Sequence, residues 1–174
     1  ERIKQTYIKA STAQKTKLYD MYSRSFRWAS DRLTEDGVLA FITSRYTLDK
    51  QSPKVRQYLA RHAELLAAAR LPRNAFRANA GTEVVTDVLL FQKSMQPAHD
   101  TNAVWLETVP QTFRDEDDDT YEIKLNGFYV RHPEYLLGTP TVGRGLYQAR
   151  EFVLLEDGRD IAASLAEALI AQLP

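Results

Sequence analysis

One continuous apolar run, VLAFIT at residues 38–43, constrains the fold more than any other stretch of this chain. A strand without polar alternation is usually covered on both faces, as in a parallel sheet packed by helices. The preceding residues, 18–33, place apolar side chains at intervals of three and four, which predicts an amphipathic helix. Gly37, between the two, is expected to take the left-handed conformation that closes a helix. The sequence therefore predicts a helix–strand unit of an α/β layered fold.

The residues after this strand set helix propensity against the need for a second strand. Ser52 and Pro53 suit a helix start, with Ser52 as N-cap and Pro53 at the first helical position. Alanine and leucine are strong helix formers, so propensity alone would continue that helix to Arg70. A sheet needs a partner strand, however, and residues 65–71 are the nearest candidate. We therefore predict a strand there.

A third strand is predicted at residues 84–92, where valine, leucine and phenylalanine are frequent. Asp87 interrupts its apolar residues, which indicates either a bend or a polar contact at that position. The later part of the chain has weaker patterns. Its expected features are a short strand at 104–109, a solvated acidic linker at 115–119, a packed segment at 121–138, a strand at 151–155 and a helix at 160–173.

Charge and composition restrict the classes of function. Lys plus Arg number 23 and Asp plus Glu number 23, so the formal net charge is zero. The chain as a whole therefore does not attract nucleic acid or membrane, and any DNA-binding face has to be a local patch of positive charge. Cysteine is absent, which excludes disulfides and thiolate zinc sites and fits a reducing compartment, so a cytoplasmic location is expected. No apolar run is long enough to span a bilayer. The polar start, residues 1–17, is interpreted as a solvated loop or a loop over a ligand cleft, and it suggests a fragment of a larger protein.

Residues 71–81 form the most unusual predicted loop, because Phe76 lies there among two arginines and two asparagines. Two interpretations stay open. Phe76 is either an apolar anchor that pins the loop or a platform on which a base stacks beside cations that bind the backbone. Signatures of a P-loop, a nucleophile elbow or an HExxH site are missing. His62 has no second ligand at metal-binding spacing, and the acids at 115–119 cannot all point at one ion, so no metal site is predicted.

Four segments carry a family resemblance: KTKLYDMYSRSFRWASDRL, GVLAFITSRYTL, TEVVTDVLLFQK with the Phe76 loop before it, and NGFYVRHPEYLLGT. In this order they resemble the later half of the catalytic domain of adenine-N6 DNA methyltransferases, closest to those fused to helicase or restriction modules. The family's catalytic Asn-Pro-Pro-Tyr or Asn-Pro-Pro-Phe and its glycine-rich loop for S-adenosylmethionine are absent from this sequence. In the family both would precede Glu1, so the resemblance implies a fragment of such an enzyme.

The resemblance implies an α/β fold and an assignment for each part of the chain. A partial Rossmann-like methyltransferase sheet with flanking helices would occupy residues 1–95, followed by a linker with the acidic run at 96–120 and a small α+β extension at 121–174. The last strand of the sheet would run antiparallel to its neighbour, at the sheet edge. The implied partners are DNA, the upstream methyltransferase half, and helicase or restriction modules, with no membrane. S-adenosylmethionine would bind the intact enzyme and not this fragment alone.

Few of the family's site residues fall on this chain, and none of them is catalytic. Phe76 matches the aromatic residue that stacks on the flipped target adenine, and flipping is needed because the reacting amine is inaccessible inside a duplex. Tyr19 or Tyr22 falls in the helix that flanks the cofactor pocket. Candidates for DNA phosphate contacts, each of which could equally be a solvated surface charge, are Arg45, Lys50, Arg73 and Arg77. The alternative function is a non-catalytic interaction module that keeps a methylase-like half-fold and docks a partner protein.

Overall fold

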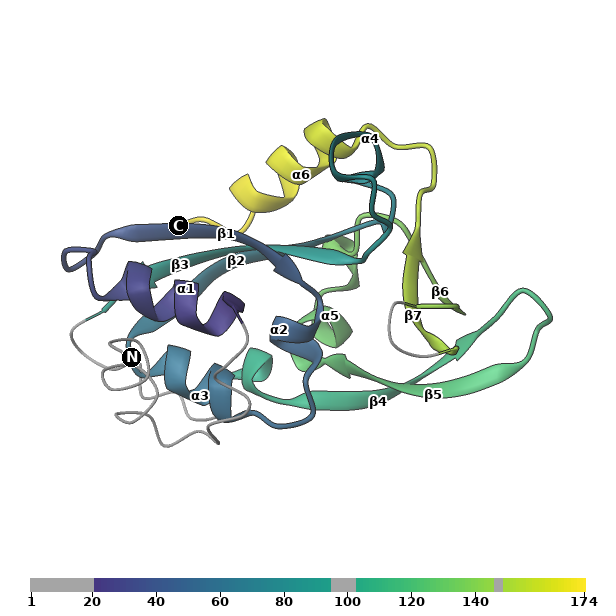
Figure 1. Cartoon of the computed structure of the whole chain (residues 1–174), viewed down its shortest axis with the longest axis horizontal. Helices are drawn as coiled ribbons and strands as arrows, with labels where there is room; N and C mark the ends of the chain where they lie inside the picture. Colours follow the sequence, from purple (N-terminus) through teal and green to yellow (C-terminus); the bar gives the residue numbers. More distant parts are fainter. Residues whose placement is uncertain (1–20, 95–102, 146–148) are drawn as a thin grey trace.

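The computed structural model describes residues 21–94, 103–145 and 149–174 (Figure 1). Its elements are, in chain order, α1 Met21–Ser30, β1 Val38–Ser44, α2 Tyr46–Asp49, α3 Lys54–Ala60, β2 Ala63–Leu71, α4 Arg77–Ala80, β3 Thr86–Lys93, the 3-10 turn η3 Val104–Leu106, β4 Thr108–Arg114, β5 Thr120–Asn126, α5 Gly127–Arg131, the 3-10 turn η4 Pro133–Tyr135, β6 Thr139–Gly143, β7 Glu151–Leu155 and α6 Ile161–Ile170. The chain is thus a mixed α/β protein with several helices and three small antiparallel sheets.

The main sheet has the strand order β1-β3-β2, and β3 runs antiparallel to both neighbours. All three predicted strands are confirmed within two residues at each end. The expected antiparallel direction of the last strand is confirmed as well, but its expected place at the sheet edge is wrong. Because β3 lies between the other two, β1 and β2 run in the same direction and end at the same side of the sheet.

Tertiary pairing overrides helix propensity in β2. Helix α3 ends at Ala60, and the chain then pairs with β3 from Ala63 to Leu71. The side chains of Ala67 and Ala69 are buried, which their small size permits beneath neighbouring elements. Helix α6 packs on this strand, and the Gln172 side-chain amide both donates to Ala68 O and accepts from Ala68 N. These contacts favour the extended chain over the helix that alanine alone would form.

Helices cover both faces of the sheet, but unevenly. Figure 1 shows α6 on one side and α1 with α3 on the other. Phe26 of α1 packs against Phe41 of β1 and Phe91 of β3, with ring centroids 4.7 and 5.4 Å apart. The same hydrophobic core includes Leu125 and Phe152, so residues from both the 1–95 and 121–174 ranges share it.

Strand β1 is not covered on both faces, which corrects the first expectation from the sequence. Val38 and Ile42 are 53% and 52% exposed, whereas Leu39 and Phe41, on the opposite face, pack against the core. The physical reason is the position of α6, which contacts β2 instead of extending over β1. An unbroken apolar run therefore marks a strand here, but it does not mark burial of both faces.

Two expected helix ends also differ in detail. The left-handed conformation belongs to Asp36, with φ 61°, and not to Gly37. Gly37 is required for space instead, because a Cβ there would lie 2.9 Å from Thr34 O. At the start of α3, Pro53 itself is the N-cap and Ser52 makes no capping hydrogen bond, so the helix begins one residue later than expected.

The later part of the chain contains two hairpins and the closing helix. Residues 104–106 form a 3-10 turn, and the strand expected at 104–109 begins only at Thr108. The acidic run at 115–119 is the turn that joins β4 to β5, a hairpin that extends away from the helices in Figure 1. The strand expected at 151–155 is confirmed as β7. The last helix is confirmed as α6, which is shorter than the expected 160–173. Its N-cap is Asp160, whose carboxylate accepts hydrogen bonds from two backbone amides.

Candidate functional site

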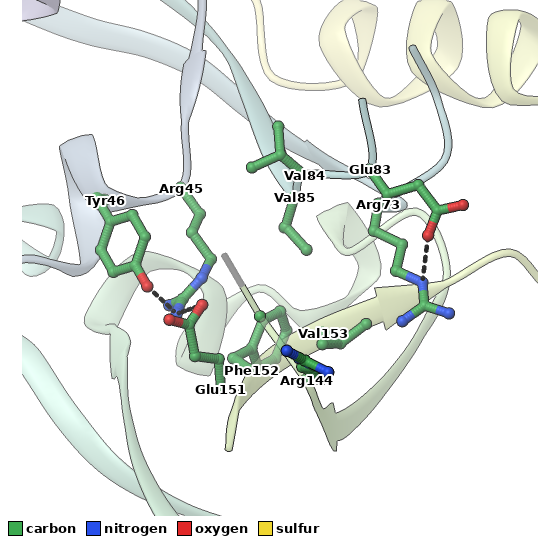
Figure 2. Close-up of a pocket in the computed structure, with 11 residues that line it drawn as sticks. Arg45, Tyr46, Arg73, Glu83, Val84, Val85, Arg144, Glu151, Phe152 and Val153 are labelled. Carbon is green, nitrogen blue, oxygen red and sulfur yellow. Dashed lines mark hydrogen bonds and ion pairs between the residues drawn. The ribbon is translucent and has the colours of Figure 1, made fainter. Parts of the chain in front are cut away.

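A hollow lies where β1 and β2 end and β3 begins, facing the β6–β7 hairpin (Figure 2). It is lined by Arg45, Tyr46, Arg73, Glu83, Val84, Val85, Arg144, Gly145, Glu151, Phe152 and Val153. The carboxyl ends of like-directed strands are a common place for ligands in α/β proteins. The enclosed space is ≈ 20 Å³, little more than one water molecule needs. The described residues can therefore contact a small group here, but they cannot enclose a whole cofactor.

Arg45 forms the inner wall of this hollow and is held by side chains from two elements. Its guanidinium donates to the Asp49 carboxylate at 3.1 Å and to the Tyr46 hydroxyl at 3.0 Å, and it lies 3.4 Å from Glu151 of β7. Burial raises the pKa of Tyr46 to about 12, helped by Glu151 and opposed by Arg45. The hydroxyl therefore stays protonated at neutral pH. Arg45 itself is buried, so the geometry favours a positioning role over a direct phosphate contact.

Beneath Arg45, a fully buried ion-pair network ties the sheet to the later part of the chain. Arg70 of β2 donates to the carboxylates of Asp49 and Asp87, with shortest distances of 2.7 Å each. The Tyr129 hydroxyl of α5 donates to Asp87 at 3.2 Å, and the Arg70 guanidinium lies 4.4 Å above the Tyr129 ring. The polar contact that Asp87 indicated in the sequence is thus confirmed.

The charges in this network are set by burial and by one another. Burial lowers the pKa of Arg70, but Asp49 and Asp87 more than compensate, so its pKa rises overall. Burial raises the pKa of Asp87 against the opposing effect of Arg70. A buried ion pair of this kind adds little stability compared with apolar residues of the same shape. Removing only one partner, however, is strongly destabilising, because it leaves a buried charge unpaired. We infer that it fixes the position of the hollow's inner wall.

A third buried arginine, Arg56, holds the turn that carries Arg45 and Asp49. Arg56 of α3 donates to the carbonyl oxygens of Leu48, Lys50 and Leu106 at 2.6 to 2.8 Å. Burial lowers the pKa of Arg56 to about 10, so it stays charged at neutral pH. Because its partners are backbone carbonyls on two segments, Arg56 joins the end of α2 to η3.

The outer wall of the hollow is exposed and more loosely paired. Arg73 lies 3.7 Å from Glu83, and Arg77 lies 3.3 Å from the same carboxylate. Exposed pairs of this length contribute little to stability and are screened by salt. Arg144, at the end of β6, is exposed, and no carboxylate among the described residues lies within ion-pair distance of it.

Phe76 lies in the loop that follows β2, close to this outer wall. It is partly buried and packs against the small apolar cluster of Ala69, Leu71, Val88, Leu137 and Ala168, beneath α6. The loop is also tied to β7, because Arg73 N donates to Leu154 O at 2.9 Å. Phe76 therefore has a packing role on one side, and its proposed stacking role stays a prediction.

The remaining candidate residues lie away from the hollow or outside the described part. Lys50 is in the turn after α2 and does not line the hollow. Tyr22 is on the exposed side of α1, and Tyr19 falls outside the described residues. Sequence reasoning missed Arg144, Glu151 and the pairing of Arg70 with Asp87. Only Asp87 gave a signal, as a charge within an apolar strand.

Two findings concern other classes of site. The described residues contain no group of three or more His, Asp or Glu placed to hold a metal ion. Within the described ranges, no helix has the length and apolar character needed to cross a membrane. Comparisons of the chain with models of protein families, with curated proteins and with solved structures found no match.

Proposed function

We propose that this chain is the later half of the catalytic domain of an adenine-N6 DNA methyltransferase, with a Rossmann-like sheet completed by an upstream half. Its share of the work is to present the target-base side of the cleft and part of the DNA track. One observation carries the proposal. The Phe76 loop and an arginine-lined hollow meet at the side of the sheet where β1 and β2 end, with β3 reversed between them.

The open surface of β1 supports an upstream partner. Among the described residues, β1 pairs with β3 alone, so its other edge has no strand beside it. Its outward face carries the exposed Val38 and Ile42. Apolar residues on an unpaired strand are a liability unless another element covers them. An upstream half that adds a strand to this edge and a helix over this face would remove that liability.

The hollow beside the Phe76 loop is too small to hold S-adenosylmethionine. The hollow at the strand ends encloses ≈ 20 Å³, far below the roughly 300 Å³ at which ligand pockets begin. A larger space of ≈ 280 Å³, between the start of β2 and α5, lies at the opposite end of the strand and is lined by Trp105 and Phe128. Under this proposal the methyl donor belongs to the upstream half, and this chain contributes stacking and phosphate contacts.

The alternative function is a non-catalytic module that docks a partner protein, and a specific observation favours it. Ile170, the last residue of α6, and Leu173, which follows the helix, are 70% and 41% exposed. Helix α6 has a single charged residue, Glu167, so it is apolar on nearly every side. A helix of this kind is normally covered by other protein. The alternative predicts that this surface, and not the Phe76 loop, determines function.

The test compares Phe76 variants of the intact enzyme. Phe76→Ala should lose roughly 1–3 kcal/mol of interaction with the extruded base, up to about a hundredfold in affinity or rate. Phe76→Trp should keep much of the activity, because stacking needs an aromatic face. The measurements are N6-methyladenine formation and fluorescence of 2-aminopurine at the target position. Thermal unfolding of Phe76→Ala in this chain measures the packing role of Phe76 separately from stacking. The loss of stability is expected to be small, because Phe76 is only partly buried.

Two outcomes would contradict the proposal. One is an intact protein that forms no N6-methyladenine in any DNA. The other is a Phe76→Ala protein that unfolds at a much lower temperature, yet flips the base normally in the molecules that remain folded. In that case Phe76 is an anchor, and the interaction module becomes the better description.

A further inference from the structure

The β6–β7 hairpin contributes a cation to the hollow beside the Phe76 loop. Arg144 lines the hollow together with Arg73, although the two residues are separated by more than seventy positions in the sequence. In Figure 2 the Arg144 guanidinium lies on the β6–β7 side of the hollow, and Arg73 lies on the side of the β2–β3 loop. Sequence reasoning assigned no role to the chain after residue 95.

Several contacts fix the hairpin against the loop. Arg73 N donates to Leu154 O of β7, and the Asn74 side-chain amide donates to the Glu156 carboxylate. On the hairpin, a Cβ at Gly145 would overlap the Glu151 carboxylate, so the backbone after Arg144 lies directly on that side chain. Arg144 is therefore carried by a backbone that is held in place relative to the loop.

The charges around the hollow leave Arg144 as the available cation. Both carboxylates that line it have other partners, because Glu151 lies beside Arg45 and Glu83 lies between Arg73 and Arg77. Arg144 is exposed, with no carboxylate of the described chain in ion-pair range. The Arg73–Glu83 distance of 3.7 Å is long, so a stronger anion could displace Glu83. The lining residues carry three positive and two negative charges, a net of +1.

The geometry points to a binding site for one phosphate of the nucleic-acid backbone, held between Arg73 of the β2–β3 loop and Arg144 of the β6–β7 hairpin. A phosphate oxygen fits a hollow of this size, whereas a base or a cofactor does not. Arginine suits this ligand because its planar fork donates two parallel hydrogen bonds to phosphate oxygens. The inference deepens the proposed function, on which it rests, by giving the C-terminal extension a part in binding DNA.

The experiment measures binding of labelled single-stranded and duplex oligonucleotides to the 174-residue chain by fluorescence anisotropy at low salt. Arg144→Gln and Arg73→Gln should each weaken binding about tenfold, the loss of one charge-assisted hydrogen bond. Arg61→Gln is the matched control. It removes the same charge from an exposed residue before β2, about 30 Å away along the nine residues of that strand. Circular dichroism should be unchanged for Arg144→Gln, because that side chain is exposed.

Salt dependence tests whether the two arginines share one phosphate. Each phosphate contact adds about 0.9 to the slope of log affinity against log salt for duplex DNA, and about 0.7 for single strands. The double variant Arg73→Gln/Arg144→Gln should lose about one contact's worth of slope. Loss of two would contradict a shared phosphate, and loss of none would overturn the site.

Three further outcomes overturn the inference. The first is an Arg144→Gln protein that binds both oligonucleotides as the Arg61→Gln control does. The second is absence of DNA binding by the parent chain at low salt. The third is an Arg144→Gln protein that loses affinity for pyrophosphate but not for DNA, which would identify a site for free anions.

The inference and the proposed function can fail separately. If the intact protein forms no N6-methyladenine but DNA binding still depends on Arg144, only the proposed function fails. If methylation depends on Phe76 while Arg144→Gln changes neither affinity nor salt slope, only the phosphate site fails.

Discussion

At the scale of single residues, Arg70 has the most demanding environment in the described chain. It is fully buried and pairs with two carboxylates, Asp49 and Asp87, at 2.7 Å each. Arg70→Met keeps the side chain's approximate length but leaves two buried carboxylates without a cation. The cost should be about 3–5 kcal/mol of unfolding free energy, measured by urea denaturation.

Arg159→Met is the matched control for Arg70. Arg159 also pairs with a carboxylate, that of Asp157, but in an exposed turn. Its removal should change stability by less than about 1 kcal/mol. If both variants lost the same small amount of unfolding free energy, the ion-pair network around Arg70 would contribute no more to stability than an exposed pair.

His62 gives the chain a pH dependence of predictable sign. Its Nδ1 is 2.9 Å from Tyr58 O, which requires the proton on Nδ1. Burial, and then Arg27, lower the pKa of His62 in the folded chain. The unfolded chain therefore takes up a proton first, near pH 6.5. The contribution of His62 to stability is present above that pH and is lost as the pH falls toward the lower folded pKa.

A comparison of urea midpoints from pH 7.5 to pH 5 tests the role of His62. His62→Gln removes this titration, so the fall in stability between those values should become smaller in the variant. An unchanged fall would assign the acid sensitivity to other groups.

At the scale of elements, strand β6 is preceded by Gly138 and ends with Gly143, two glycines in different surroundings. A Cβ at Gly138 would overlap the backbone carbonyl of Leu155, whereas one at Gly143 would meet Val153 Cγ2 at 3.4 Å, an ordinary contact. Gly138→Ala should therefore destabilise by about 1–3 kcal/mol, the usual cost of overpacking. Gly143→Ala should stay within about 0.5 kcal/mol. Thermal or urea unfolding of both variants measures the difference, and similar losses for the two would show that the hairpin yields at Gly138.

Elements determined by nearby residues could be predicted from the sequence, whereas features that depend on distant elements could not. The strands at 38–44 and 86–93 follow from dense apolar runs, and that at 63–71 follows from the need for a pairing partner, which outweighs alanine's helix propensity. The exposed face of β1 could not be foreseen, because it depends on where α6 packs. The acidic run at 115–119 looked like a linker because its hairpin is created by pairing of the strands on either side.

The candidate site was predictable only in its local part. Phe76 and Arg73 stand out because they are unusual within their own loop. Arg144 and Glu151 reach the hollow through the position of the β6–β7 hairpin, which no short pattern encodes. Asp87 could be recognised as a polar contact, but its partner Arg70 could not be chosen from sequence, since the pairing is set by register across β2 and β3.

At the scale of the whole molecule, the parts assigned as 1–95 and 121–174 are joined by shared interior contacts. Tyr129 donates to Asp87, and Asn126 N donates to the Asp49 carboxylate at 3.0 Å. Trp105 packs edge-on against Phe91 of β3, with centroids 5.9 Å apart. Each of these contacts would be lost if either part unfolded alone, so buried groups of the other part would lose hydrogen bonds and packing.

The chain should therefore unfold in one cooperative transition, and its two tryptophans provide the test. Trp28 lies on α1 in the first part, and Trp105 lies in η3, in the 96–120 segment that leads into the later part. In Trp28→Phe the fluorescence reports on Trp105, and in Trp105→Phe it reports on Trp28. Within each variant, the urea midpoint by fluorescence should coincide with that by circular dichroism, as two-state unfolding requires.

The two variants are expected to differ in stability, since Trp105 is buried and Trp28 is exposed. Comparing the two probes inside one variant removes that difference. If the Trp105 signal changed at a lower urea concentration than the circular dichroism, the later part would be a separately folding extension, and the ion-pair network would be a contact between two domains instead of the centre of one.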